Sequence, residues 1–390
     1  MIDFELGPEL SALRERVRAF VDSEVIPREG DLHHHDHDSL ERVRRGLQTR
    51  AKAAGIFAPT LPRTLGGLGL SWREIAVVLE ESGRSLFGPQ ALNAAAPDEG
   101  NMHMLEHVAS EAQKKRYLHP LAAGETRSCF AMTEPMPGAG ADPANLRTRA
   151  ERRGSSWVID GEKWFITGAQ GAAFAIVLAR APEGATMFFV EMTNPGMKLT
   201  RTIATLDHLT PGGHGQLTFE RCEVPAEAVI GEAGKGFDYA QLRLVPARLT
   251  HCMRWLGVAV RAMEIAAAYA NERISFKHRL ADHQSVQNMI ADSHIEIHAT
   301  RLMIWNAAWL LDRGEQPRQE SSMTKVFAAE TVNRVVDRAL QICGALGVSE
   351  DVQLATFYRE ARPFRIYDGP SEVHRGAIAR RVLKSAGARP

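Results

Sequence analysis

Hydrophobic residues at both ends of the chain repeat with the spacing of an α-helix. The first series stands three or four positions apart: Leu10, Leu13, Val17 and Phe20. We expect Pro27 to end that helix, because proline cannot continue the hydrogen-bond ladder. Ser71 followed by Glu74 has the pattern of a capping box, so another helix is expected to begin there. Residues 1–125 are therefore predicted to form an N-terminal α-helical domain.

The pattern changes between residues 126 and 235. Short apolar and β-branched runs, which are typical of strands, occur at 157–159, 176–178, 187–190 and 217–219. Asp160-Gly161 and Asn194-Pro195-Gly196 are expected to be turns between strands. The segment is predicted to be a small β-barrel or sandwich domain.

Long helical stripes return after residue 236. One stripe comprises Val286, Ile290, Ser293, Ile297, Thr300, Ile304, Ala308 and Leu311. Stripes of this length need partners on more than one side, which a four-helix bundle that also packs on a second subunit would provide. Residues 236–390 are therefore predicted to form a C-terminal bundle, and the fold class is α+β with the order α, β, α.

Composition narrows the function classes. Lys plus Arg and Asp plus Glu both number 47, so the net charge is zero and no global basic field favours nucleic acid or an anionic membrane. The longest uncharged run, 164–179, is too short to span a bilayer. The first ten residues have neither the pattern of a signal peptide nor that of a transit peptide, so a cytoplasmic location is expected.

Cysteine and histidine usage does not predict a metal site. The four cysteines lie far apart and are expected to be separate reduced thiols. The run His33-His34-His35-Asp36-His37-Asp38 is internal, and adjacent side chains in a loop point in different directions. We interpret it as a solvated loop and predict no metal.

Four segments carry residues suited to chemistry. Residues 129–142 contain a Thr-Glu-Pro corner and a glycine-rich loop, which could bind a ring edge or a pyrophosphate, or could be a tight turn. Residues 157–168 resemble a hairpin ending in aromatic residues and a threonine, which suit a flat heterocycle or simply a strand core. Residues 271–278 place Arg and Phe at a helix end, where they could bind a diphosphate and adenine or be a solvated terminus. Residues 365–375 place an acid before Gly-Pro, where it is either a desolvated base or a helix cap.

In this order, and in a chain of this length, the four segments resemble the flavin-dependent acyl-CoA dehydrogenase family over essentially all 390 residues. The likeness is closer to the branch that contains the mammalian members ten and eleven. Three segments carry that closer likeness: 95–102, 248–254 and 368–374. Most of the family has Glu-Gly-Thr where this chain has Asp368-Gly369-Pro370.

The resemblance implies a cofactor, FAD, which lies in that family between the β domain and the C-terminal bundle. Phe130, Met132 and Thr133 would line the flavin, Phe165 would pack on its ring, and Thr167 would bond near N5. The remaining cofactor-binding positions implied are Gly369 and, from a neighbouring subunit, Arg273, Phe276, Gln341 and Gly344 on the ADP half. A homodimer or a dimer of dimers is therefore expected.

The resemblance also implies the reaction. Asp368 would remove the α-proton of an acyl-CoA while the β-hydrogen leaves as hydride to flavin N5, and electrons would pass to an electron-transferring flavoprotein. The backbone N–H of residue 368 and a ribityl hydroxyl would share the enolate charge. Arg248 and Tyr367 would line the substrate slot. Ala141 stands where a serine often contacts pyrophosphate, and Pro370 replaces a threonine.

Three alternatives remain open at this stage. The same hydrogen removal could process a 4-hydroxy or 4-phospho acyl-CoA. Nitroalkane oxidases share this fold and use an aspartate base, so a different flavin reaction is a second alternative. The third is a DNA-associated, non-enzymatic member, which the neutral net charge disfavours.

Overall fold

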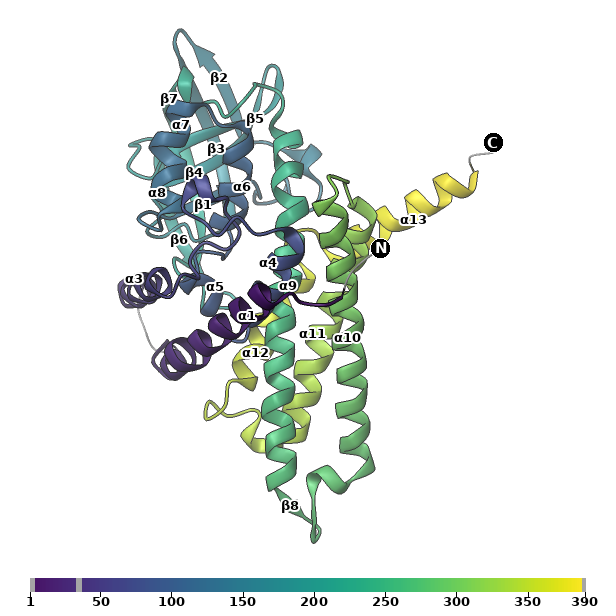
Figure 1. Ribbon diagram of the computed structural model, residues 1–390. Coiled ribbons are helices and arrows are strands. Elements are labelled where there is room, and N and C mark those ends of the chain that lie inside the picture. The colour runs from purple at the N-terminus through teal and green to yellow at the C-terminus, as the bar shows by residue number, and fades with distance from the viewer. Residues whose placement is uncertain (1–3, 33–36, 388–390) are drawn as a thin grey trace. The chain divides into compact units, whose positions relative to one another are not determined.

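The computed structural model describes residues 4–32 and 37–387, and it confirms the fold class: helices, then strands, then helices (Figure 1). The α-helices are α1 Pro8–Phe20, α2 Glu29–Leu32, α3 His37–Ala53, α4 Trp72–Ser82, α5 Gly88–Ala91, α6 Asp98–Val108, α7 Glu111–Gln113, α8 His119–Ala122, α9 Gly236–Glu272, α10 Gln284–Asp312, α11 Arg318–Cys343, α12 Leu354–Ala361 and α13 Ser371–Gly387. The strands are β1 Ser128–Ala131, β2 Arg149–Arg153, β3 Ser156–Thr167, β4 Phe174–Ala181, β5 Gly184–Glu191, β6 Met197–Ile203, β7 His214–Pro225, β8 Ile274–Ser275 and β9 His278–Arg279. The histidine run lies mostly outside the described residues.

The described residues form two compact units, each assembled from separate stretches of chain. One unit, here the helical unit, comprises 1–30, 70–89 and 248–390. The other, the β unit, comprises 31–69 and 90–247. The long helix α9 contributes residues to both, because it begins at Gly236 and ends at Glu272.

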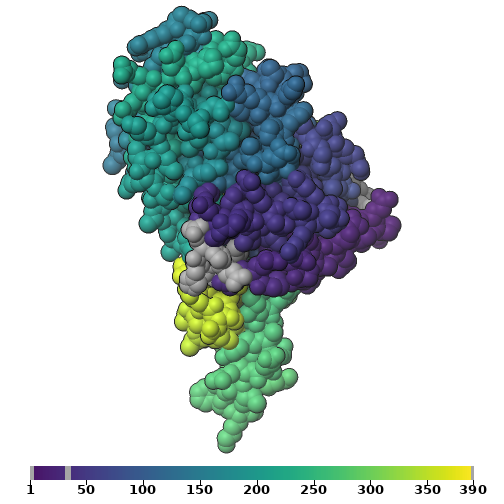
Figure 2. All heavy atoms as spheres, turned by 90° about the vertical axis from the view of Figure 1, so that its left-hand side faces the viewer, coloured from purple at the N-terminus to yellow at the C-terminus, as the bar shows by residue number. Residues whose placement is uncertain are grey.

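The β unit is built on a seven-stranded sheet with the order β1-β4-β2-β3-β7-β6, and β5 pairs with β4. Strand β4 is buried except at Arg180, as its apolar run from Phe174 to Ala179 requires. Its register with β5 runs without interruption from Phe174 opposite Glu191 to Ala181 opposite Gly184. Figure 2 shows the surface of the strands, in teal, beside the blue segments that contain α6 to α8.

Two local expectations are wrong. Asp160-Gly161 is not a hairpin turn, because β3 continues through it as a single strand with a bulge opposite β7. Gly161 has φ 149°, and a Cβ there would lie 2.7 Å from the Thr148 Cα, so glycine is needed for close approach and not for a reversal. Pro27 does not end the helical path either: α1 stops at Phe20, and Pro27 is the second residue of a later 3₁₀ turn, Ile26–Arg28, where its missing N–H is not required.

Other local expectations are confirmed. Ser71 and Glu74 form both hydrogen bonds of the capping box at α4. Asp312, at the end of α10, accepts hydrogen bonds from the Trp72 and Arg73 N–H groups at the start of α4. Its carboxylate therefore stabilises the positive, N-terminal end of α4. The turn at 194–196 is present, and all four cysteines are buried and unbridged.

A buried ion pair shapes the loop that follows β1. Lys163 Nζ lies 2.9 Å from Glu134 Oε1, and both side chains are excluded from solvent. Lys163 also donates to the Met132 carbonyl, and Glu134 accepts from the backbone N–H groups of Ala139 and Thr148. Burial alone would raise the pKa of Glu134, but these partners lower it to about 2. The loop between β1 and β2 is therefore held in one shape by a single carboxylate.

We predict that Lys163→Met lowers the free energy of unfolding by about 3 kcal/mol, because it leaves Glu134 charged and buried without its cation. Denaturant unfolding measures the difference. Lys198→Met is the matched control, since Lys198 is an exposed lysine on the same sheet. Equal stability of the two variants would contradict this role of the pair.

Candidate functional site

Phe130, Phe165 and the loop that carries Thr133 all belong to the β unit. Phe130 lies near the end of β1 and is half-buried, while Phe165 lies in β3 and is 45% exposed. Phe165 has φ 52° and sits where the β3–β7 register shifts, so a bulge turns its side chain away from the regular alternation. The Trp164 N–H donates to the Thr133 carbonyl at 3.0 Å, which ties the loop carrying Met132 and Thr133 to β3. The loop that carries Thr133 is thereby tied to the strand that carries Phe165.

A buried arginine supports Phe130. The Arg243 guanidinium lies 4.2 Å from the centre of the Phe130 ring. Its Nε donates to Asn101 Oδ1 at 2.7 Å, and Asn101 Nδ2 donates to Ser128 Oγ at 2.8 Å. Ser128 in turn donates through both its N–H and its hydroxyl to Asp98 Oδ1. This network fixes the strand that carries Phe130.

Thr167, the last residue of β3, is hydrogen-bonded rather than isolated. Its Oγ1 lies 3.1 Å from His214 Nδ1, and His214 Nε2 lies 3.0 Å from Asp207 Oδ2. Burial would raise the pKa of Asp207, but the hydrogen bond with His214 lowers it. Thr167, His214 and Asp207 therefore form one continuous polar chain in the β unit.

The helical unit places Asp368 in an elbow between Arg362–Arg365 and α13. Asp368 has φ 52° and Gly369 has φ 96°, so two consecutive residues adopt left-handed conformations. A Cβ on Gly369 would lie 2.6 Å from His374 Nε2. The Asp368 side chain is only 17% exposed. Its direction is thus set by the backbone and by the lack of room around Gly369.

Three side chains hold the carbonyl groups of the elbow. Arg248 Nε donates to the Asp368 carbonyl at 2.9 Å, and His374 Nε2 lies 3.1 Å from the same oxygen. Lys325 Nζ donates to the Gly369 carbonyl at 2.8 Å. Burial, together with the positive charge of Arg248, lowers the pKa of His374 to about 4, so His374 is neutral at pH 7 and uses Nε2–H as its donor. Burial also lowers the pKa of Lys325, to about 8.

His251 and Tyr367 flank the acid. His251 Nε2 lies 3.2 Å from Asp368 Oδ2. The His251 and Tyr367 rings are 5.0 Å apart, and Trp255 Nε1 donates to the Tyr367 hydroxyl at 2.5 Å. The structure therefore brings Asp368, Gly369, Arg248 and Tyr367 together, with His251 at the carboxylate.

The other predicted residues lie on the surface. Arg273 follows the end of α9 and Phe276 lies at the tip of the β8–β9 hairpin, where it is 88% exposed (Figure 1). Gln341 and Gly344 are exposed at the end of α11, and Ala141 is exposed in the loop before β2. Their roles stay predictions.

Sequence reasoning missed several residues of these clusters. His251 and Trp255 follow Arg248 by three and seven positions, a helical spacing that places them on the same face and could have indicated them. Lys325 is the charged residue among the buried residues of α11, and a lysine within an apolar helical stripe could have indicated a functional position. Arg243 carries no such local pattern, because its partners Asn101 and Phe130 are distant in sequence. Asp207 and His214 are only seven residues apart, but the irregular segment between them has no periodic spacing that would indicate the contact.

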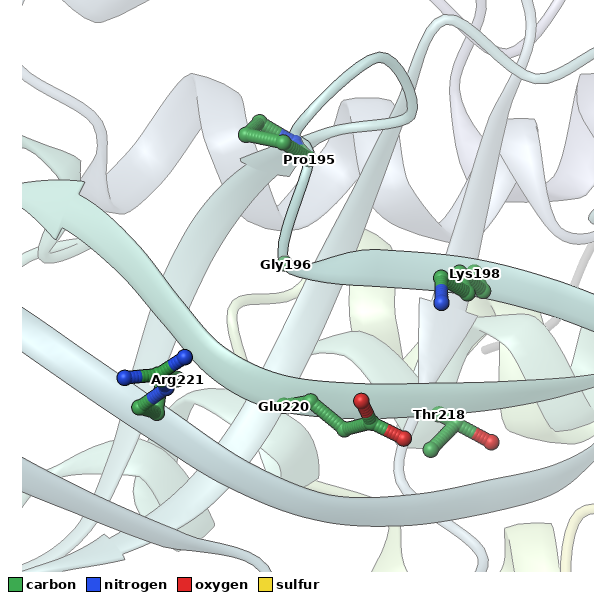
Figure 3. Close-up of a pocket in the computed structure, with 6 residues that line it drawn as sticks. All are labelled: Pro195, Gly196, Lys198, Thr218, Glu220 and Arg221. Atoms are coloured by element: carbon green, nitrogen blue, oxygen red, sulfur yellow. The ribbon is translucent and has the colours of Figure 1, made fainter.

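A separate hollow lies over β6 and β7 (Figure 3). It has a volume of about 220 Å³ and is lined by Pro195, Gly196, Lys198, Thr218, Glu220 and Arg221. None of the predicted site residues borders it, and its charged side chains are exposed. Among the described residues, no helix is long and apolar enough to cross a membrane.

Comparisons with known proteins match most of the chain. Family models described as the N-terminal, middle and C-terminal domains of acyl-CoA dehydrogenase match residues 7–125, 129–222 and 234–383. Human acyl-CoA dehydrogenase family member 11 is 36% identical over 96% of this chain, which spans about half the length of that relative. The probable acyl-CoA dehydrogenase FadE2 of Mycobacterium tuberculosis is 35% identical, over 98% of this chain and 97% of its own.

Solved structures agree. A putative acyl-CoA dehydrogenase from Mycobacterium abscessus has a TM-score of 0.92 and 37% identity, covering 98% of this chain and all of its own. A glutaryl-coenzyme A dehydrogenase in complex with glutaryl-CoA has a TM-score of 0.88 and 30% identity, covering 100% and 98%. An FAD complex of PigA, with a TM-score of 0.87 and 22% identity over 98% and 99%, shares the fold.

The elbow yields a stability prediction. Gly369→Ala should lower the free energy of unfolding by about 1–3 kcal/mol, because φ 96° is strained for alanine and the Cβ would meet His374. Gly376→Ala in α13 is the control, since there the nearest atom is the flexible end of Arg380 at 3.4 Å and alanine favours the helix. Thermal unfolding of both variants checks the result, and a neutral Gly369→Ala would refute the conformational argument.

Proposed function

The chain belongs to the acyl-CoA dehydrogenase family, and from that premise we propose that it catalyses the FAD-dependent α,β-dehydrogenation of an acyl-CoA thioester, with Asp368 as the base. The observation that carries the proposal is the elbow. A partly desolvated carboxylate stands on a left-handed backbone whose carbonyl is held by Arg248 and His374. Such a group is positioned to remove a proton.

The residues of the β unit fit FAD. Flat apolar faces from Phe130 and Phe165 suit an isoalloxazine ring, and the hydroxyls of Thr133 and Thr167 suit its polar edge. The anchored 133–139 loop offers a fixed backbone beside them. When bound, FAD supplies the acceptor for the hydride that leaves the β-carbon.

The chain's own residues then have distinct tasks. Asp368 removes the α-proton, and its backbone N–H supports the charge that develops on the thioester oxygen. Arg248 and Lys325 keep the elbow in place through its carbonyl groups, and Tyr367, held by Trp255, lines the thioester slot. His251 is close enough to Asp368 to share its proton.

We further propose a homodimer or a dimer of dimers in which Arg273, Phe276, Gln341 and Gly344 bind the ADP half, and an electron-transferring flavoprotein as the acceptor. The exposure of Arg273 and Phe276 on a hairpin supports this. The 4-hydroxy or 4-phospho acyl-CoA variant is a second candidate, supported by the cationic Arg248 and Lys325 next to the base. A panel of acyl-CoAs, with and without these substituents, distinguishes the two by the rate of flavin bleaching under anaerobic mixing.

Asp368→Asn should retain FAD and slow flavin reduction by acyl-CoA at least about 100-fold, because the amide cannot take the proton. Anaerobic stopped-flow absorbance measures the rate. Asp351→Asn, at an exposed aspartate in the same unit, is the control and should react normally. Flavin reduction at the wild-type rate in Asp368→Asn would show that another residue is the base. Peroxide formation from a nitroalkane without CoA would favour nitroalkane chemistry instead.

Arg273→Ala should reduce the FAD content of the purified protein several-fold, since it removes a charge proposed to bind the diphosphate. The ratio of flavin absorbance to protein absorbance measures this. Arg279→Ala, an exposed arginine of the same hairpin that is paired with Asp282, is the matched control. Equal flavin content in the two variants would count against a role for Arg273.

A further inference from the structure

The polar chain behind Thr167 has a defined order. Thr167 ends β3 and pairs in register with His214, the first residue of β7. Thr167 Oγ1 lies 3.1 Å from His214 Nδ1, and His214 Nε2 lies 3.0 Å from Asp207 Oδ2. The Thr205 hydroxyl donates to the Asp207 carbonyl at 2.6 Å, which anchors the acid. His214 and Asp207 side chains are each 14% exposed, so water competes little for these bonds.

For a neutral His214 ring, the order of the chain determines where each hydrogen lies. A carboxylate only accepts hydrogen bonds, so Asp207 requires the hydrogen of neutral His214 to be on Nε2. His214 Nδ1 then carries a lone pair, and it must accept from the Thr167 hydroxyl. Since a hydroxyl has one hydrogen and two lone pairs, Thr167 directs its hydrogen at His214 and keeps its lone pairs for another partner.

We propose that Asp207 and His214 are positioning residues that turn Thr167 into a hydrogen-bond acceptor toward N5 of the flavin. This inference rests on the proposed function, in which FAD binds the β unit, and on the position near N5 that the family resemblance implies for Thr167. N5 of an oxidised isoalloxazine accepts hydrogen bonds, whereas in the reduced ring N5 carries a hydrogen and donates. An acceptor facing N5 stabilises the reduced ring, so the Asp207–His214–Thr167 chain raises the reduction potential of the bound flavin.

Removing the acceptor behind Thr167 tests the proposal. In His214→Phe the Thr167 hydrogen loses its partner and becomes available to oxidised N5, so the equilibrium should shift toward the oxidised flavin. We expect a shift of about tenfold, which is about 30 mV for a two-electron couple, measured by equilibration with a reference dye. Asp207→Asn should shift it in the same direction, because an amide can donate to Nε2 and allow the hydrogen to move to Nδ1.

A double-mutant cycle separates this role from a general structural effect. Thr167→Val removes the hydroxyl, and adding His214→Phe to it should then change the potential no further. Thr200→Val is the matched control, because Thr200 is an exposed threonine of the same sheet whose hydroxyl donates to the Gln216 carbonyl. The flavin absorption maximum should change in His214→Phe and Asp207→Asn and stay constant in the control.

The outcomes are distinguishable from failure of the proposed function. Wild-type protein that retains no FAD would overturn the proposed function, and with it this inference. FAD that binds and bleaches normally, with potentials of His214→Phe and Asp207→Asn within about threefold of wild type, would overturn the inference alone. An equal shift in the Thr167→Val background would also overturn it. If His214→Phe loses FAD, Asp207→Asn provides the potential measurement.

Discussion

The geometry at Asp368 depends on hydrogen bonds to two consecutive carbonyl oxygens. Arg248 and His374 reach the oxygen of Asp368, and Lys325 reaches the oxygen of Gly369. A left-handed pair of residues has few intrinsic reasons to persist, so these donors select one conformation out of several. The three donors come from three different helices, α9, α11 and α13. The packing of these helices therefore fixes the backbone of the elbow and, through it, the direction of the Asp368 carboxylate.

The β unit uses a comparable device. Lys163 reaches the Met132 carbonyl while paired with Glu134, and Glu134 collects the backbone N–H groups of the loop. In both units a buried basic side chain fixes irregular backbone near the residues proposed for chemistry. Buried charges are retained in proteins mainly when they are paired and hydrogen-bonded, and Lys163 and Glu134 meet that condition.

The sequence predicted the helices and strands that depend on local periodicity. The prediction was wrong where the same residues occur in two kinds of local structure. The stripe from Val286 to Leu311 predicted α10 because burial of one helical face requires it. Asp160-Gly161 could be a turn or a bulge, and only pairing with β7 decides between them. Asp368 was proposed from its motif, whereas Arg243 was not, because its partner Phe130 is brought close only by tertiary folding. The spacing of three residues from Arg248 could have indicated His251, but spacing alone does not show which face of a helix lines a functional site.

The short side chain at position 368 has a consequence for selectivity. Aspartate has two rotatable bonds between its backbone and its carboxylate, one fewer than glutamate, so it has less rotamer entropy to lose when it is ordered. Because the main chain is already fixed at φ 52°, the Asp368 carboxylate can reach only a small range of positions. A ligand must therefore bring its reacting carbon to the acid, and discrimination among ligands falls to how well each one reaches that point.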